Sequence, residues 1–216
     1  MNEEAASSQV EPSPKGDCYS AGERAWMEYG QELRARACAP LFGLLTQLRV
    51  GPDHLTFLSL VFGVAFGPLW YLDWEWLAVT SLWMHVAVDG LDGPLARFQK
   101  SESPRGSFTD SFCDQLVVST VTIMLMVGTP KLPVFAGAIF LVLYAGVLAI
   151  AMVRNTLQIP YSWLVRPRFF LFLAIPLQLL GVPHSVASVV WVSNVLLAIK
   201  LATGFYKLRN RLDGPV

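Results

Sequence analysis

Apolar stretches of membrane-spanning length recur along this chain and constrain its fold more than any other feature. They lie at about 55–72, 76–97, 108–127, 132–152, 163–182 and 186–205, each close to the roughly 20 residues that a bilayer requires. Hydrophobic residues make up 54% of the chain and charged residues 15%, and this balance is too apolar for a single soluble domain. We therefore predict an all-α integral membrane protein with six transmembrane helices.

The sequence before these stretches is more polar. Residues 1–20 contain no apolar run typical of a signal peptide, and we predict a disordered polar tail. Residues 21–48 mix arginines with apolar residues such as Trp26 and Leu33, which predicts an amphipathic helix on the membrane surface, with a soluble cap helix as the alternative. We assign residues 21–210 to one membrane domain and residues 211–216 to a C-terminal tail.

The basic residues predict how the chain is oriented. Of its 16 lysines and arginines, Lys131 alone falls outside when both termini are placed in the cytoplasm. Since short cytoplasmic loops collect lysine and arginine, this bias predicts an even number of spans in a multi-pass protein of the cell membrane. It also places both termini and the acidic residues described next on the cytoplasmic side. No basic tract is interleaved with aromatic residues, so we expect no nucleic-acid partner.

Four aspartates lie within two of the predicted spans. Asp89 and Asp92 are three residues apart and Asp110 and Asp114 are four apart, so each pair shares one face of its helix. An ionised carboxylate near a bilayer centre costs roughly 2.5–3.5 kcal/mol, so the group needs positive partners. Arg97 is the nearest obvious counter-charge, but one or two divalent cations would balance the group better. All-oxygen ligation suits Mg²⁺, Mn²⁺ or Ca²⁺ rather than zinc.

These aspartates belong to a longer pattern, DxxDGxxAR followed eight residues later by GxxxDxxxD. It matches without a gap at Asp89, Asp92, Gly93, Ala96, Arg97, Gly106, Asp110 and Asp114. The pattern resembles the signature of the class I CDP-alcohol phosphotransferases (CDP-alcohol phosphatidyltransferases). That family's six-span membrane fold agrees with the apolar stretches, and the resemblance covers residues 21–210.

The resemblance implies roles for individual residues. The four aspartates would bind Mg²⁺ or Mn²⁺, two ions in all, and Asp114 would also be the general base for the acceptor hydroxyl. The start of the first span, PDHLT, is similar to the family's PNxxT, with Asp53 in place of asparagine. The residues expected to contact the CDP donor are then Asp53, Thr56, Gly93, Ala96, Arg97, Ser103 and Gly106. His85, one turn before Asp89, either lines this pocket or packs between helices, and packing is favoured.

The implied activity is transfer of a phosphatidyl group from CDP-diacylglycerol to an alcohol, with release of CMP. Glycerol phosphate and inositol phosphate are the favoured acceptors and serine is a third. Arg154, Arg166 and Arg168 either reflect cytoplasmic topology or form a pocket for an anionic acceptor. Family members are commonly dimers, so a homodimer is compatible with the resemblance. The alternatives are an intramembrane aspartate-rich prenyltransferase and a non-enzymatic divalent-cation transporter or scaffold.

Overall fold

The computed structural model describes residues 38–128, 132–157 and 166–212, and all regular structure in these ranges is helical. A short helix, Cys38–Gln47, precedes six longer ones. These are α2 (Pro52–Tyr71), α3 (Glu75–Phe98), α4 (Pro104–Val127), α5 (Val134–Thr156), α6 (Pro167–Leu179) and α7 (Ser185–Leu212). Each predicted span coincides with one of the six. The predicted tail, residues 1–20, lies outside the described residues, as do residues 21–37 of the predicted surface helix.

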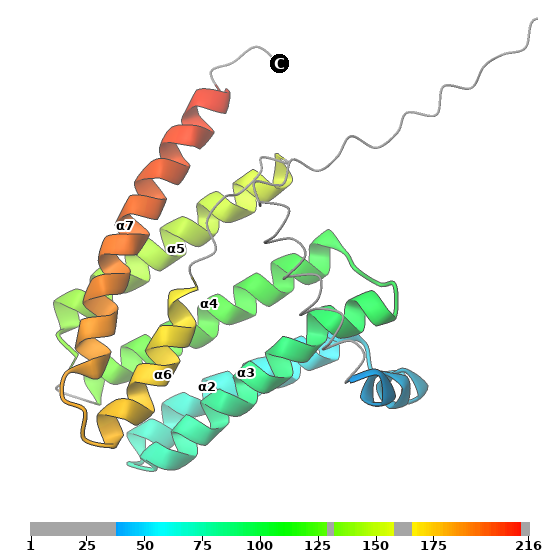
Figure 1. The fold of residues 1–216 in the computed structure, drawn as a ribbon, viewed down its shortest axis with the longest axis horizontal. Coiled ribbons are helices and arrows are strands. Elements are labelled where there is room, and N and C mark those ends of the chain that lie inside the picture. Colours follow the sequence, from blue (N-terminus) through cyan, green and yellow to red (C-terminus); the bar gives the residue numbers. More distant parts are fainter. Residues whose placement is uncertain (1–37, 129–131, 158–165, 213–216) are drawn as a thin grey trace, which may run out of the picture.

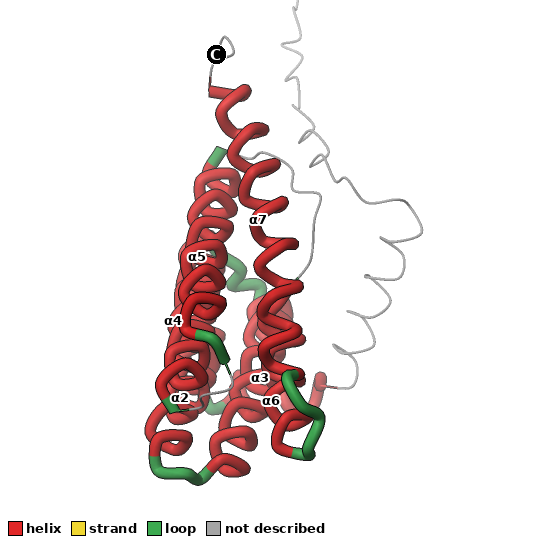
Figure 2. The backbone as a smooth tube through the Cα atoms, turned by 90° about the vertical axis from the view of Figure 1, so that its left-hand side faces the viewer, coloured by secondary structure: helices red, strands yellow, loops and turns green. Residues whose placement is uncertain are grey.

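The six helices form two packed halves. α2 packs against α3 and α4, whereas α7 packs against α5 and α6, as Figure 1 shows. Contacts of α4 with α5 and of α3 with α6 join the halves, and the bundle is elongated in the perpendicular view of Figure 2. The short helix is tied to the end of α3, because the Gln99 side chain donates hydrogen bonds to Thr46 Oγ1 (3.1 Å) and to the Val50 carbonyl (2.9 Å). α3 and α4 therefore lie between α2 on one side and α5 and α6 on the other.

A glycine sets the close approach of α2 to α4. A Cβ atom on Gly63 would overlap the side chain of Val117, which is fully buried. The surrounding core consists of branched and aromatic side chains, among them Phe66, Leu82, Val121, Phe140, Leu171 and Ile175. Because a side chain at position 63 does not fit, the glycine lets α2 lie directly against Val117 of α4. This contact helps to position the N-terminal half of α4 relative to α2.

We expect Gly63→Ala to lower the free energy of unfolding by about 1–3 kcal/mol, because an added methyl group overpacks this contact. Thermal unfolding in detergent measures the effect as a fall in Tm. Gly43→Ala is the matched control, since nothing lies within 4 Å of a Cβ atom at Gly43. Equal Tm values for the two variants would show that the α2–α4 contact adjusts freely.

Four of the described helices are long and apolar enough to cross a membrane: α2, α4, α5 as far as Arg154, and α7 as far as Arg211. Large apolar side chains point outward from them, with Val61 65% and Val142 71% exposed, as expected for helices that face lipid. The other two helices differ. α3 carries two aspartates of the acidic group in its C-terminal half, and α6 has only 13 residues. The predicted total of six spans therefore stays a prediction.

Candidate active site

Three of the four predicted aspartates converge between α3 and α4. One carboxylate oxygen from each of Asp89, Asp92 and Asp110 lies within 4.8 Å of the others. The sequence spacing explains this arrangement, since Asp89 and Asp92 share a face of α3 and Asp110 lies in the N-terminal half of α4. Three carboxylates so close together fit a hard divalent cation such as Mg²⁺ or Mn²⁺ in the chemistry of their donor atoms. These residues are the candidate metal ligands.

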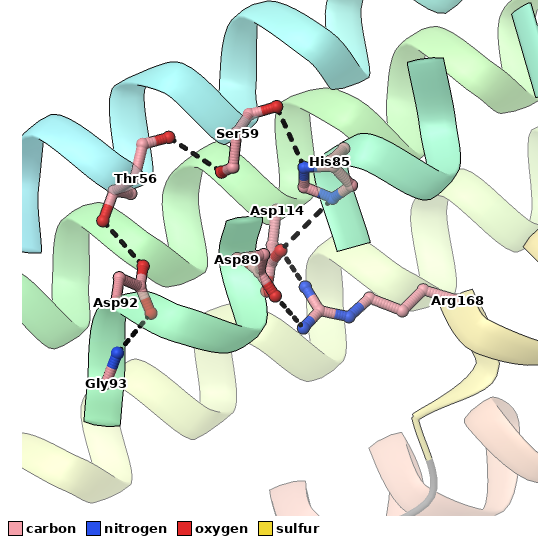
Figure 3. Close-up of polar contacts among 8 residues, drawn as sticks. All are labelled: Thr56, Ser59, His85, Asp89, Asp92, Gly93, Asp114 and Arg168. Carbon is pink, nitrogen blue, oxygen red and sulfur yellow. Dashed lines mark hydrogen bonds and ion pairs between the residues drawn. The ribbon is translucent and has the colours of Figure 1, made fainter. Parts of the chain in front are cut away.

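Hydrogen bonds hold the Asp92 side chain in place (Figure 3). Thr56 Oγ1 on α2 donates to Asp92 Oδ2 at 2.7 Å, and the Gly93 amide donates to Asp92 Oδ1 at 2.6 Å. Asp92 is only 7% exposed, so its orientation depends on these two donors. The sequence pattern predicts that Thr56 contacts the CDP donor. Its hydroxyl orients a candidate metal ligand, and Thr56 also lines the cavity described below, so the donor contact stays a prediction.

Asp114 belongs to a second group, with His85 and Asp89, whose potential ligand atoms also lie within 4.8 Å of one another. An arginine from α6 joins this group. Arg168 Nη2 donates to Asp89 Oδ2 at 3.1 Å, and Nη1 contacts Asp114 Oδ1. Figure 3 shows the guanidinium reaching across to both carboxylates. Asp89 is therefore shared between two groups, and Asp114 lies in the second.

Arg168 corrects the prediction that Arg97 is the counter-charge. The Arg97 side chain is 45% exposed and lies 3.9 Å from Glu102. Eight residues separate Arg97 from Asp89, a rise of about 12 Å along a helix, which carries Arg97 away from the second group. The Arg168 side chain is 6% exposed and packs over the Phe169 ring at 4.8 Å. A buried arginine in contact with two carboxylates stabilises their negative charge far better than an exposed one.

His85 is part of this site. It is 1% exposed, and its Nδ1 lies 3.1 Å from the Ser59 carbonyl oxygen on α2. Its Nε2 lies 4.0 Å from Asp114 Oδ1. The sequence places His85 one turn before Asp89 on the same face of α3, so its position could be found from the spacing. The interpretation as a helix-packing residue accounts for its burial and for its edge contact with Phe172, but omits its place beside Asp114.

A cavity of about 480 Å³ opens next to Asp92 and Asp110. All seven residues predicted to contact the CDP donor line it: Asp53, Thr56, Gly93, Ala96, Arg97, Ser103 and Gly106. The remaining lining residues come from the segment before α2, the α3–α4 connection and the first turns of α2 and α4. The seven predicted donor residues, which span 54 positions of the chain, are thus brought to one cavity.

The N-terminal turns of α2 and α4 both face this cavity. Ser103 is the N-cap of α4, and its Oγ accepts a hydrogen bond from the Gly106 amide at 3.0 Å. A Cβ atom on Gly106 would lie 3.3 Å from Ser103 Oγ and 4.0 Å from Asp53 Oδ1, so glycine keeps this corner open. Helix N-termini carry partial positive charge and free amides, which favour phosphate groups. Ser103 therefore has a structural role as the helix cap as well as a place in the cavity wall.

The three arginines predicted for the acceptor have different environments. Arg154, near the end of α5, is 4% exposed, and Arg168 is engaged by the carboxylates. Arg166 is exposed and is the N-cap residue of α6. The structure therefore places two of these guanidinium groups in the protein interior and one at its surface. An acceptor pocket that includes all three stays a prediction.

A family model described as CDP-alcohol phosphatidyltransferase matches residues 49–206, which include the cavity, both carboxylate groups and Arg168. The chain belongs to this family. A relative in Escherichia coli (strain K12), "Inner membrane protein YnjF", is 30% identical over 97 residues, or 45% of this chain. That match spans 47% of the relative's own length.

Structures of a Mycobacterium tuberculosis protein, phosphatidylinositol phosphate synthase (PgsA1), have the same fold. The structure with CDP-DAG bound matches with a TM-score of 0.67 at 20% identity, covering 79% of this chain and 92% of that one. The complex with manganese and citrate matches with a TM-score of 0.65 at 19% identity, covering 77% and 86%. At these identities the likeness establishes the fold of this chain.

Proposed function

We propose that this protein transfers a phosphatidyl group from CDP-diacylglycerol to an alcohol and releases CMP. The observation that carries the proposal is the cavity in which all seven predicted donor residues meet Asp92 and Asp110. Membership of the CDP-alcohol phosphatidyltransferase family supports the reaction class. The M. tuberculosis protein of the same fold is named a phosphatidylinositol phosphate synthase and has a structure with CDP-DAG bound. This supports CDP-diacylglycerol as the donor.

The cavity suits the polar head of such a donor. Its volume of about 480 Å³ is typical of a site for a small molecule. The helix N-termini and Arg97 offer positive groups to a pyrophosphate. Bound by Asp89, Asp92 and Asp110, Mg²⁺ or Mn²⁺ would supply further stabilisation of the negative charge on the phosphate oxygens. The exposed apolar faces of the helices would accommodate the acyl chains in the surrounding lipid.

In the proposed reaction the acceptor hydroxyl oxygen attacks the phosphorus that carries the diacylglycerol. The bond from that phosphorus to the CMP oxygen breaks, and CMP leaves with the bonding electrons. The Asp114 carboxylate takes the hydroxyl proton as general base. Arg168 contacts Asp114 from α6, which orients the carboxylate, and neither residue lines the cavity. Asp114 is therefore assigned to proton transfer, and the cavity residues to donor binding.

The proposed acceptor is an alcohol that carries a phosphate, either inositol phosphate or glycerol phosphate. Arg154 is buried, and a guanidinium group binds phosphate with two parallel hydrogen bonds. Serine, the third candidate, has no phosphate for this arginine. The distribution of basic residues supports a site and termini on the cytoplasmic side. A homodimer is compatible with this assignment.

Release of CMP tests the reaction directly. The purified protein is supplied with CDP-diacylglycerol, Mg²⁺ or Mn²⁺, and one acceptor at a time, and we expect CMP with one alcohol phosphate. An intramembrane prenyltransferase would release no CMP, and a transporter or scaffold would show no turnover. The family match already favours the transferase over both alternatives. No CMP with any acceptor would overturn the proposed function.

We expect Arg154→Ala to raise the KM for the acceptor by about tenfold or more and to leave the KM for CDP-diacylglycerol unchanged. Loss of a charge-assisted hydrogen bond to phosphate costs about 1.5–3 kcal/mol, which sets this magnitude. Steady-state CMP release at varied concentrations of each substrate measures both constants. Arg209→Ala, at an exposed position in the last turn of α7, is the control. An equal rise in both KM values would remove Arg154 from the acceptor site.

A further inference from the structure

We propose that His85 is a nitrogen ligand of a second divalent ion, bound together with Asp89 and Asp114. With a nitrogen among its donor atoms, this site would take a transition-metal ion such as Mn²⁺ in preference to Mg²⁺. The proposal deepens the proposed function and rests on it for the use of divalent ions. It adds a ligand outside the aspartate signature and assigns the two ions to different donor sets that share Asp89.

The orientation of the His85 ring leaves one nitrogen available to an ion. Nδ1 lies 3.1 Å from the Ser59 carbonyl oxygen, and because a carbonyl only accepts, Nδ1 carries the hydrogen. Nε2 then carries the lone pair, and Figure 3 shows this side of the ring facing Asp114. Histidines that bind metals generally donate their other ring hydrogen to a carbonyl or carboxylate, which fixes the tautomer and the ring. The bond between His85 and Ser59 is of this kind.

The distances fit one shared ion. His85 Nε2 and Asp114 Oδ1 are 4.0 Å apart, which is too long for a hydrogen bond. Two ligand atoms that are each about 2.1 Å from an ion lie at most about 4.2 Å apart, so a single ion can contact both. An oxygen of Asp89 lies within 4.8 Å of the other two ligand atoms, so a shift of about 0.6 Å or less brings it within reach of the same ion. Burial of His85 to 1% exposure prevents the ring from turning toward solvent.

Arg168 approaches the same carboxylates from another side. Its two terminal nitrogens contact Asp89 Oδ2 and Asp114 Oδ1 from α6, whereas His85 projects from α3. A carboxylate has about four lone-pair sites, so each aspartate has room for both the guanidinium and an ion. The arginine's positive charge opposes an ion bound beside it. We therefore expect this second site to bind Mn²⁺ more weakly than the group of Asp89, Asp92 and Asp110.

Pulsed electron paramagnetic resonance of bound Mn²⁺ tests the proposal without turnover. The full chain, made without a polyhistidine tag and purified in detergent, is loaded with Mn²⁺, and nitrogen coupling to the ion is measured. We expect ¹⁴N coupling in the wild type, replaced by ¹⁵N coupling when the chain carries ¹⁵N-histidine. His85→Gln should remove the coupling and lower Mn²⁺ affinity at the second site by about 10–100-fold. The Mg²⁺ affinity should change less.

The chain has three histidines, which permits an assignment by elimination. His184→Gln, in the exposed turn before α7, is the matched control and should keep the coupling. His54→Gln should keep it too, because His54 Nδ1 accepts the Gly51 amide at the entrance of α2. If His85→Gln fails to fold, persistence of the coupling in both other variants supports His85, and its loss in either overturns the proposal.

Two further outcomes would overturn the His85 assignment: Mn²⁺ bound without nitrogen coupling in the wild type, or coupling that survives in His85→Gln. CMP release, measured on the same samples, separates this inference from the proposed function. Release of CMP by protein that binds Mn²⁺ through oxygen alone would support the proposed function and overturn the assignment of His85 as a ligand. Nitrogen coupling without CMP release from any acceptor supports the His85 ligand and overturns the proposed function.

Discussion

Asp114→Asn is expected to lower the rate of CMP release by about 10²–10⁴-fold, the usual contribution of a general base. The amide has the size of the carboxylate but cannot accept the hydroxyl proton. Its oxygen can still accept from Arg168, so the local packing is kept. Asp114 does not line the cavity, and we therefore expect the affinity for CDP-diacylglycerol to stay close to that of the wild type. Single-turnover CMP release and equilibrium donor binding measure the two quantities separately.

The control for this experiment is Asp73→Asn. Asp73 lies in the exposed turn between α2 and α3 with φ 60°, a conformation that asparagine adopts readily. The control replaces a carboxylate by an amide, as Asp114→Asn does, and we expect its rate of CMP release to equal that of the wild type. Near-normal CMP release by Asp114→Asn would show that another group takes the proton. A parallel loss of donor affinity would place Asp114 among the residues that bind the donor.

Asp110→Asn is expected to reduce metal binding, donor binding and turnover together. Asp110 belongs to the group of three carboxylates and also lines the cavity, so one substitution affects the ion and the donor. A metal ion at a phosphoryl group stabilises the transition state by several kcal/mol, and about 4 kcal/mol corresponds to a rate loss of about 10³-fold. Mn²⁺ titration, CDP-diacylglycerol binding and CMP release should therefore all report the loss.

Chelation provides the comparison for Asp110→Asn. Removal of divalent ions from the wild type should abolish CMP release, and Mn²⁺ or Mg²⁺ should restore it. The same additions should not restore the variant except at much higher ion concentration. CMP release that persists in the wild type after chelation would disprove metal dependence, whatever the effect of the substitution.

The local sequence predicts much of this site because helices have a regular period. Asp89 and Asp92 share a face of α3 through their spacing alone, and Gly93 and Ala96 follow them along the helix toward the cavity. The glycine of the second motif part, Gly106, marks the first turn of α4, where a larger residue would narrow the same cavity. The resemblance to the family signature adds what spacing cannot give, namely that the two helices act on one donor.

Contacts between distant helices lie beyond such reasoning. Arg168 is 79 residues from Asp89, and nothing in the sequence around it distinguishes a counter-charge from a topological arginine. Arg97 is much nearer in sequence, but the rise of α3 carries it to the last turn of the helix, where its side chain is 45% exposed. The packing of α6 against α3 decides which of the two meets the carboxylates.

The sequence by itself determined the helical, membrane-type architecture and the pairing of aspartates on two helix faces, because these follow from hydropathy and from a period of 3.6 residues. Its resemblance to the family signature predicted the residues that the structure brings to one cavity. Only the tertiary structure decided that Asp89 is shared, that Asp114 sits with His85, and that Arg168 neutralises both carboxylates. The physical reason is that charge compensation in a low-dielectric interior depends on distances of a few ångströms between helices, and those distances depend on how the helices pack.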